Sequence, residues 1–207
     1  MTVLMKSDHL RIVRQLKRRA LLVHLCGVLL VVGLFFYPYF MKVENDLIRE
    51  AYGVVKLRIG EMDAKIRILE VLRAKTLTIR QGLDIADTVL SQRDIPVSMV
   101  LAIMDVESSF DSNAISPKGA RGLLQAMPLT SRIYAGEFSK NIHDPVINIR
   151  TCVRYLVDLK RIYGEDWAKI LRTYNGGPPN VNNKALDGYV RMVLARAKAY
   201  EVKVGQN

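Results

Sequence analysis

The stretch from Ile103 to Pro128, IMDVESSFDSNAISPKGARGLLQAMP, places a carboxylate in an otherwise apolar helix and continues into a loop with two glycines. Few polar residues interrupt the helix expected from Val97 onward, and a helix that is apolar nearly all round is a buried one. Burial disfavours the charged form of a carboxyl group and raises its pKa. Glu107 is therefore predicted to act as a general acid. The alternative is a glutamate that faces solvent at the helix end or pairs with Arg121.

Two polar segments further along the chain have the composition of a ligand-binding wall. The loop DSNAISPKGARGLLQAMP contains glycines, which let backbone groups approach a ligand, and Gln125, whose amide bonds to amides or hydroxyls. The segment TYNGGPPNV joins an aromatic ring and an amide to a Gly-Gly-Pro-Pro turn. Sugar rings have apolar faces bordered by hydroxyls, so aromatic and amide side chains together suit a glycan.

Helical signals continue through the C-terminal part of the chain, residues 78–207. Apolar residues recur at helical spacing, and capping signals mark the expected helix starts: Asp94 with Pro96, Asp144 with Pro145, and Asp166. Gly164 is expected to end the helix that begins at Asp144. No alternating strand pattern is found. The sequence predicts an all-α domain.

The N-terminal residues predict a membrane anchor. Residues 1–19 carry six Lys or Arg against one Asp, which gives +5 of the net +11. Residues 20–41 contain no charge and would span about 33 Å as a helix, enough for a hydrocarbon core of about 30 Å. Basic residues stay in the cytoplasm, so the rest of the chain is predicted outside. The bulky exit at residues 35–40 disfavours a cleaved signal peptide, which is the alternative.

A stalk is predicted over residues 42–77, between the anchor and the domain. Its apolar residues are separated by alternating steps of four and three: Ile48, Tyr52, Val55, Ile59, Met62, Ile66 and Leu69. This spacing is typical of a coiled coil or of an amphipathic helix laid on a partner. Self-association through residues 45–75 and packing of the stalk on its own domain both remain open.

Composition argues against several other classes of protein. Only three histidines are present, and His9 and His24 lie in the arm and the anchor, so no metal site is predicted. Cys26 and Cys152 are separated by the membrane boundary, so no disulfide is expected. No phosphate-binding Walker loop is found, and no cofactor is predicted. The excess positive charge lies mainly in the arm, which disfavours nucleic-acid binding.

The motifs occur in an order that resembles a known family. VLAIMDVESSF, SPKGARGLLQAMP, DPVINIRTCVRYL, TYNGGPPNV and a final GYV resemble the catalytic domain of soluble-type (SLT) lytic murein transglycosylases, which are related to goose-type lysozymes. The resemblance covers about residues 78–200. It implies a lysozyme-like helical catalytic domain, here preceded by one transmembrane helix and an amphipathic stalk. It also implies a bacterial protein that acts on peptidoglycan. Together with the predicted anchor, this gives an expected location in the inner membrane, with the domain in the periplasm or otherwise outside the cytoplasm.

The resemblance implies a role for individual residues. Glu107 would be the single general acid/base, with Ser108 hydrogen-bonding close to the substrate and Tyr189 standing near Glu107. The residues implied to line the glycan groove are Gln125, Tyr174 and Asn175. The chain departs from the family pattern at three positions, where Leu124 replaces Met, Thr173 replaces Ala and Pro179 replaces Gly.

The implied reaction cleaves the β-1,4 bond between N-acetylmuramic acid and N-acetylglucosamine without water and forms a 1,6-anhydro ring. Most glycosidases need a second carboxylate. Asp105 lies about 200° round the helix from Glu107 and is expected to point elsewhere, whereas Asp111, Glu137 and Asp144 are not placed by the sequence. Two alternatives therefore remain, a hydrolytic muramidase and a wall-binding scaffold of a secretion or conjugation apparatus.

Overall fold

The computed structural model describes residues 2–73 and 78–204, with side chains from residue 13 onward. Every regular element in these ranges is a helix, apart from isolated β-bridges that join residue 115 to 121 and 121 to 126. The prediction of an all-α protein is confirmed. The chain forms two compact units, residues 1–59 and 60–207, and each is described by itself.

The first unit consists of the helix α1, which runs Thr2–Leu72 and continues into the second unit. The predicted arm, anchor and most of the predicted stalk are parts of this one helix. Pro38 lies inside it and has no N–H to donate to the carbonyl of Leu34. By length and composition α1 is long and apolar enough to cross a membrane. The side chains of Lys6 and Arg11 in the predicted arm lie outside the described residues.

The second unit includes the end of α1. Ile68 and Leu72, only 0% and 3% exposed, belong to the same hydrophobic core as Ile85 of α2 (Ile79–Ser91). Lys65 forms an ion pair with Asp87 at 2.6 Å. The compact unit therefore begins at Gly60, upstream of residue 78 where the sequence placed the domain boundary, because part of the stalk is needed to fill the core. Residues 74–77 of the predicted stalk lie outside the described residues.

Helix α3 (Val97–Ser108) forms the centre of the core, and its first eight residues are all buried. Its N-cap is Pro96, which makes no side-chain cap bond, so the prediction that Asp94 caps this helix is wrong. Helix α3 packs mainly on α7 (Asp187–Val204). Near its C-terminal end, the Phe110 and Tyr200 rings meet edge to face at 6.4 Å.

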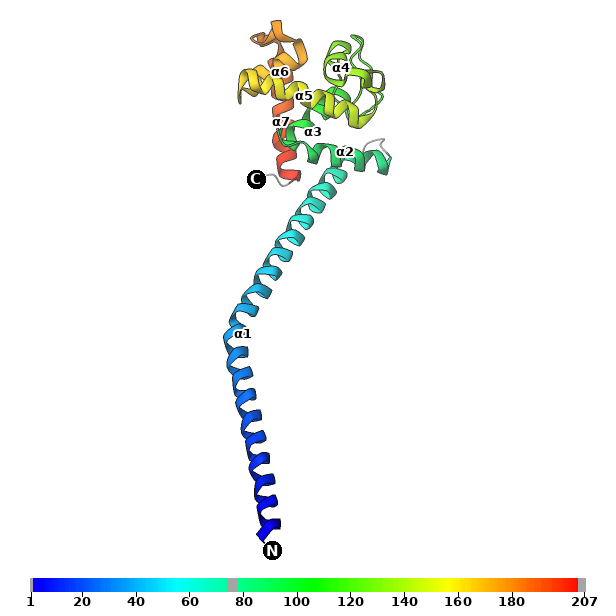
Figure 1. The fold of residues 1–207 in the computed structure, drawn as a ribbon. Helices are drawn as coiled ribbons and strands as arrows, with labels where there is room; N and C mark the ends of the chain where they lie inside the picture. Colours follow the sequence, from blue (N-terminus) through cyan, green and yellow to red (C-terminus); the bar gives the residue numbers. More distant parts are fainter. Residues whose placement is uncertain (1, 74–77, 205–207) are drawn as a thin grey trace. The chain divides into compact units, whose positions relative to one another are not determined.

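Helix α5 (Pro145–Tyr163) is, with α7, one of the two long helices of the unit. It packs against α2, α4 and α6 (Figure 1). As predicted, Asp144 caps its start and Gly164, with φ +64°, follows its end. The short helix α4 (Pro128–Ala135) was not predicted, because its only buried residue is Ser131 and it has no apolar stripe to recognise. The 3₁₀ turns between the helices are η1 (Gly136–Asn141), η2 (Pro178–Asn180) and η3 (Lys184–Leu186).

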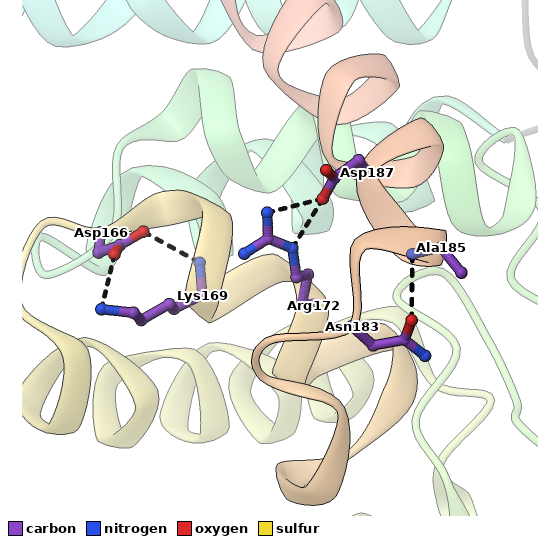
Figure 2. A network of polar contacts seen from close by, with 6 residues as sticks. All are labelled: Asp166, Lys169, Arg172, Asn183, Ala185 and Asp187. Atoms are coloured by element: carbon purple, nitrogen blue, oxygen red, sulfur yellow. Dashed lines mark hydrogen bonds and ion pairs between the residues drawn. The ribbon is translucent and has the colours of Figure 1, made fainter.

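Polar contacts fix the corner between α6 (Trp167–Gly176) and the start of α7. Figure 2 shows Arg172 and Asp187 pointing toward one another, with Nε and a terminal guanidinium nitrogen of Arg172 at 2.8 and 2.6 Å from one carboxylate oxygen. Local caps lie at the start of α6, where Asp166 accepts a bond from the N–H of Lys169, and just before α7, where Asn183 accepts one from the N–H of Ala185. The direction of the first turn of α7, which carries Tyr189, is therefore fixed.

Candidate active site

Glu107 lies in the last turn of α3 and is partly buried. The Tyr189 hydroxyl of α7 donates to its Oε1 at 2.6 Å. Burial raises the pKa of Glu107, and the hydrogen bond from Tyr189 lowers it by a smaller amount. Burial and the nearby carboxylate hold the pKa of Tyr189 well above its ordinary value, so this hydroxyl stays a donor. Glu107 therefore keeps its proton to a higher pH than an exposed glutamate does.

Ser108 ties the end of α3 to the loop that follows it. Its hydroxyl lies 2.7 Å from the carbonyl of Leu123 and 3.2 Å from that of Met104. The chain then turns sharply, since Ser109 and Phe110 have φ of 51° and 66°, in the left-handed region. The Ser108 hydroxyl thus donates to the backbone of the loop and holds the loop beside Glu107.

Asn148 of α5, which the sequence analysis missed, organises the same loop from beneath. It is fully buried, and its Oδ1 accepts from the N–H of Leu124 at 2.8 Å. Its Nδ2 donates to the carbonyls of Arg121 and Ile142 at 2.9 and 3.0 Å. A Cβ on Gly122 would come within 2.4 Å of this Nδ2, so only glycine fits there. The sequence signal that could have identified Asn148 is its amide side chain, which lies among the buried residues of α5.

Gln125 braces the loop through its side-chain amide. With φ 50°, it turns so that Nε2 donates to the carbonyls of Gly122 at 2.9 Å and Ala114 at 3.2 Å. The neighbouring Leu124 has a fully buried side chain, so the Leu-for-Met departure changes the packing of the core. Its carbonyl oxygen accepts from the Tyr174 hydroxyl at 2.7 Å.

Three tyrosines from different helices form a row that starts at Tyr174 on α6. The Tyr174 ring stacks on the Tyr155 ring of α5, with 5.8 Å between the ring centroids. The Tyr155 ring contacts the Tyr134 ring of α4, with 5.6 Å between the centroids. Of these three tyrosines, only Tyr174 is predicted from the sequence as a residue of the glycan groove. Asn175 is exposed at the end of α6, and among the described residues its side chain makes no hydrogen bond to the other site residues. Thr173 is fully buried, and its hydroxyl has no hydrogen-bond partner within the part of the chain that the structure describes.

Cys152 of α5 lies beneath the site and is 1% exposed. Its Sγ is 3.8 Å from the carbonyl of Leu124, the atom that Tyr174 also reaches. Burial raises the pKa of the thiol to about 12, so it remains protonated. It is a neutral core side chain, in agreement with the sequence interpretation.

The other candidate carboxylates have partners of their own or face solvent. Asp105 accepts from the Tyr200 hydroxyl at 2.9 Å and lies 3.4 Å from Arg196, so it points away from Glu107 as predicted. Asp111 and Asp144 accept from nearby backbone N–H groups in a turn and a helix cap, and Glu137 is exposed on η1. In the described part of the chain, no second carboxylate hydrogen-bonds to Glu107, and no cluster of three metal-ligating side chains is found.

The fold and the site together define a class of protein. A partly buried glutamic acid ends a central helix, a buried tyrosine donates to it, and a loop pinned by a serine and an asparagine forms one wall beside it. These are the parts of a general acid/base site on an all-helical scaffold. The sequence matches the transglycosylase SLT domain family over residues 85–189, just over half of the chain, and the protein belongs to this family.

Comparison with individual proteins agrees with the family. The chain is 30% identical over 95 residues to membrane-bound lytic murein transglycosylase D of Escherichia coli, a match that covers 44% of the chain and 21% of that protein. It is 33% identical over 98 residues to the soluble lytic murein transglycosylase of Escherichia coli, covering 44% of the chain and 15% of the relative. The chain thus spans only 15–21% of the length of these relatives.

Solved structures show the same fold. The 70 kDa soluble lytic transglycosylase of Escherichia coli superposes with a TM-score of 0.52 and 25% identity, over 59% of this chain and 24% of that one. An inactive glutamate-to-glutamine mutant of the lytic transglycosylase Slt from Pseudomonas aeruginosa has the same TM-score and identity, over 58% of this chain and 24% of that one. The expectation of a lysozyme-like helical domain of this family is therefore confirmed.

Proposed function

We propose that this protein is a lytic transglycosylase that cleaves peptidoglycan between N-acetylmuramic acid and N-acetylglucosamine. The observation that carries the proposal is the short contact between Tyr189 and Glu107, which holds a partly buried carboxyl group in a defined direction. The family and the named relatives support the substrate. The inactive glutamate mutant of the Pseudomonas aeruginosa neighbour agrees with dependence on one carboxyl group.

In the first step, protonated Glu107 donates its proton to the glycosidic oxygen, and the bond from that oxygen to the anomeric carbon breaks. The N-acetyl group of the muramic acid stabilises the developing cation. In the second step, the Glu107 carboxylate removes the proton from the C6 hydroxyl of the same sugar, whose oxygen bonds to the anomeric carbon. The product has a 1,6-anhydro ring, and Glu107 regains its proton. The hydroxyl is tethered to the reacting ring, which gives it a large effective concentration.

The surroundings of Glu107 support the non-hydrolytic path. A hydrolytic muramidase of the inverting type needs a second carboxylate about 6.5–9.5 Å from the acid to activate water. Asp111 and Asp144 already accept backbone bonds in a turn and a cap, and Glu137 is exposed. These local roles favour the tethered C6 hydroxyl over a water activated by a second carboxylate.

The product of a peptidoglycan digest tests the reaction. We expect muramic acid ends that carry the anhydro ring, are lighter by one water than reducing ends and take up no label when the digest is made in heavy-oxygen water. Glu107→Gln is the control, because glutamine keeps the shape but transfers no proton, and loss of general acid/base help costs about 10²–10⁴-fold in rate or more. Reducing, labelled ends would make the protein a muramidase, and wild-type rates for the variant would place the acid elsewhere.

We further propose that residues 20–41 of α1 anchor the protein in the inner membrane, with the catalytic unit in the periplasm. The uncharged run and the basic residues before it support this orientation. The Escherichia coli relative named as membrane-bound agrees with a membrane location. Anchoring would restrict cleavage to glycan strands within reach of the stalk.

A further inference from the structure

In the described part of the chain, the apolar seam of α1 defined by the four-and-three spacing is left exposed from Ile48 to Ile66. The exposed fractions of its members lie between 51% and 69% from Ile48 to Ile66. The values are Ile48 58%, Tyr52 69%, Val55 54%, Ile59 55%, Met62 63% and Ile66 51%. A continuous exposed apolar row of this length marks an interaction surface. The seam therefore needs a partner outside the chain's own core.

The catalytic unit covers a different side of the helix. Ile68 and Leu72 enter the core, whereas Met62 and Ile66 remain exposed in the same unit. The end of α1 thus has two apolar stripes, of which the domain covers one. Ile66 and Leu69 of the seam also line an apolar cavity of about 370 Å³ beside Ile79 of α2, so the uncovered apolar surface continues into this unit.

The residue types along the seam favour a two-stranded parallel coiled coil. In heptad notation, Tyr52, Ile59 and Ile66 occupy the a positions, and the d positions are Ile48, Val55, Met62 and Leu69. Toward the C-terminal end this places the β-branched Ile59 and Ile66 at a, and Met62 and Leu69, which are not branched at Cβ, at d. Such a combination favours parallel dimers over trimers and tetramers.

The flanking charges select the parallel orientation. In a parallel pair, each g residue faces the e residue five positions later on the other copy. This places Arg58 opposite Asp63 of the second copy and Lys65 opposite Glu70, so both pairs are attractive. An antiparallel pair would lose both attractions, because it would bring g residues together and these include the cations Arg58 and Lys65. Lys65 already contacts Asp87, and Glu70 of the second copy would join this ion pair.

We propose that residues 48–69 of two copies of this chain form a parallel coiled coil that holds two catalytic units on one stalk. The seam is about 33 Å long, or about three heptads, which is short for a free coiled coil. The proposed membrane anchor compensates for this length, because it holds both copies in the same orientation and raises their effective concentration. The proposal rests on that anchor but not on the reaction at Glu107.

Cysteine cross-linking of the full-length chain in membranes tests the dimer. In a Cys26→Ser background, Val55→Cys places a thiol on the seam, whereas Leu57→Cys, at an f position and 72% exposed, places one on the opposite side. With a short thiol cross-linker we expect the Val55→Cys chain to run at about twice its 23.4 kDa, in several-fold greater yield than the Leu57→Cys chain. Equal yields, monomers only or a trimer ladder would overturn the proposal.

A charge exchange tests the orientation. Arg58→Glu and Asp63→Arg should each reduce the cross-linked yield of the Val55→Cys chain, and the two together should restore it, since the attraction is then reversed but kept. Failure of the double variant to recover would overturn the parallel register. Neither residue belongs to the candidate site around Glu107. A chain that dimerises but fails to cut peptidoglycan would therefore count against the proposed function alone. A monomeric chain that cuts peptidoglycan would count against the dimer alone.

Discussion

At the scale of single residues, the surroundings of Glu107 shift its pKa in two opposite directions. Burial favours the neutral acid, and the Tyr189 hydroxyl, donating to Oε1, favours the carboxylate. Burial has the larger effect, so the pKa of Glu107 is raised. A raised pKa means that the folded protein binds a proton that the unfolded chain has already released, and this links the site to stability.

The stability of the wild type should therefore fall relative to Glu107→Gln as the pH rises. Below the ordinary pKa of 4.5, Glu107 is protonated in both folded and unfolded states and imposes no pH dependence. Above it, the folded state holds more protons than the unfolded state, so raising the pH destabilises the wild type until the folded-state pKa is passed. Urea unfolding of residues 60–207, compared for the two forms at acidic and neutral pH, measures this. A difference that does not change with pH would contradict the raised pKa.

Thr173 offers a second prediction at this scale. Its buried hydroxyl has no partner, and an unpaired buried polar group costs about 1–3 kcal/mol. Thr173→Val keeps the shape and removes the hydroxyl, so we expect the free energy of unfolding to rise by about 1 kcal/mol. Thr151→Val is the matched control, because the Thr151 hydroxyl is equally buried but donates to the carbonyl of Ile147 at 2.6 Å. The control should lower stability by about 1 kcal/mol. Thermal unfolding measures both, and equal shifts would refute the interpretation.

At the scale of elements, the end of α1 belongs to the core of the catalytic unit. Ile68 is fully buried there, whereas Ile66, two residues earlier on the same helix, is 51% exposed. In the soluble fragment of residues 60–207, Ile68→Ala should lower the free energy of unfolding by about 2–5 kcal/mol. Ile66→Ala should change it by less than about 1 kcal/mol, since little buried surface is lost. Denaturant unfolding measures both, and similar losses would mean that the helix end is not packed as described.

The loop beside Glu107 is held by a different means, through hydrogen bonds instead of apolar burial. Asn148, Ser108 and Gln125 together bond to five backbone groups of the loop and its flanks. Each of these bonds fixes one backbone group in a segment that has no regular secondary structure. The wall of the site is thus set by side chains from α3, α5 and the loop itself.

At the scale of the whole molecule, the proposed membrane anchor would determine on which side of the membrane the catalytic unit lies, and so whether it can meet peptidoglycan. The basic arm and the uncharged residues 20–41 predict that the C-terminal end lies outside the cytoplasm. Alkaline phosphatase, which is active only after export, should therefore be active when fused to the C-terminal end. A reporter active only in the cytoplasm, fused at the same point, should be silent. The reverse pair of results would contradict the proposed anchor.

The sequence by itself determined the helical class, several helix ends and the candidate acid. Asp144, Gly164 and Asp166 act through bonds to neighbouring residues, so their effect is visible in the local sequence. The same holds for Glu107, whose apolar neighbours lie on its own helix. Asp94 shows the limit of such signals, because Pro96 and not Asp94 occupies the N-cap position directly before α3.

Only the tertiary structure decided which groups meet across the chain. Asn148 reaches Leu124 over 24 residues, and the Ser108 hydroxyl bonds to the backbone of the loop. The contact of Tyr189 with Glu107 over 82 residues was implied by the family resemblance and not by any local signal. The division of the end of α1 into a buried and an exposed stripe belongs here as well, since both stripes have the same apolar composition. Spacing along a helix shows that a face is apolar, but what covers that face depends on the packing of elements distant in sequence.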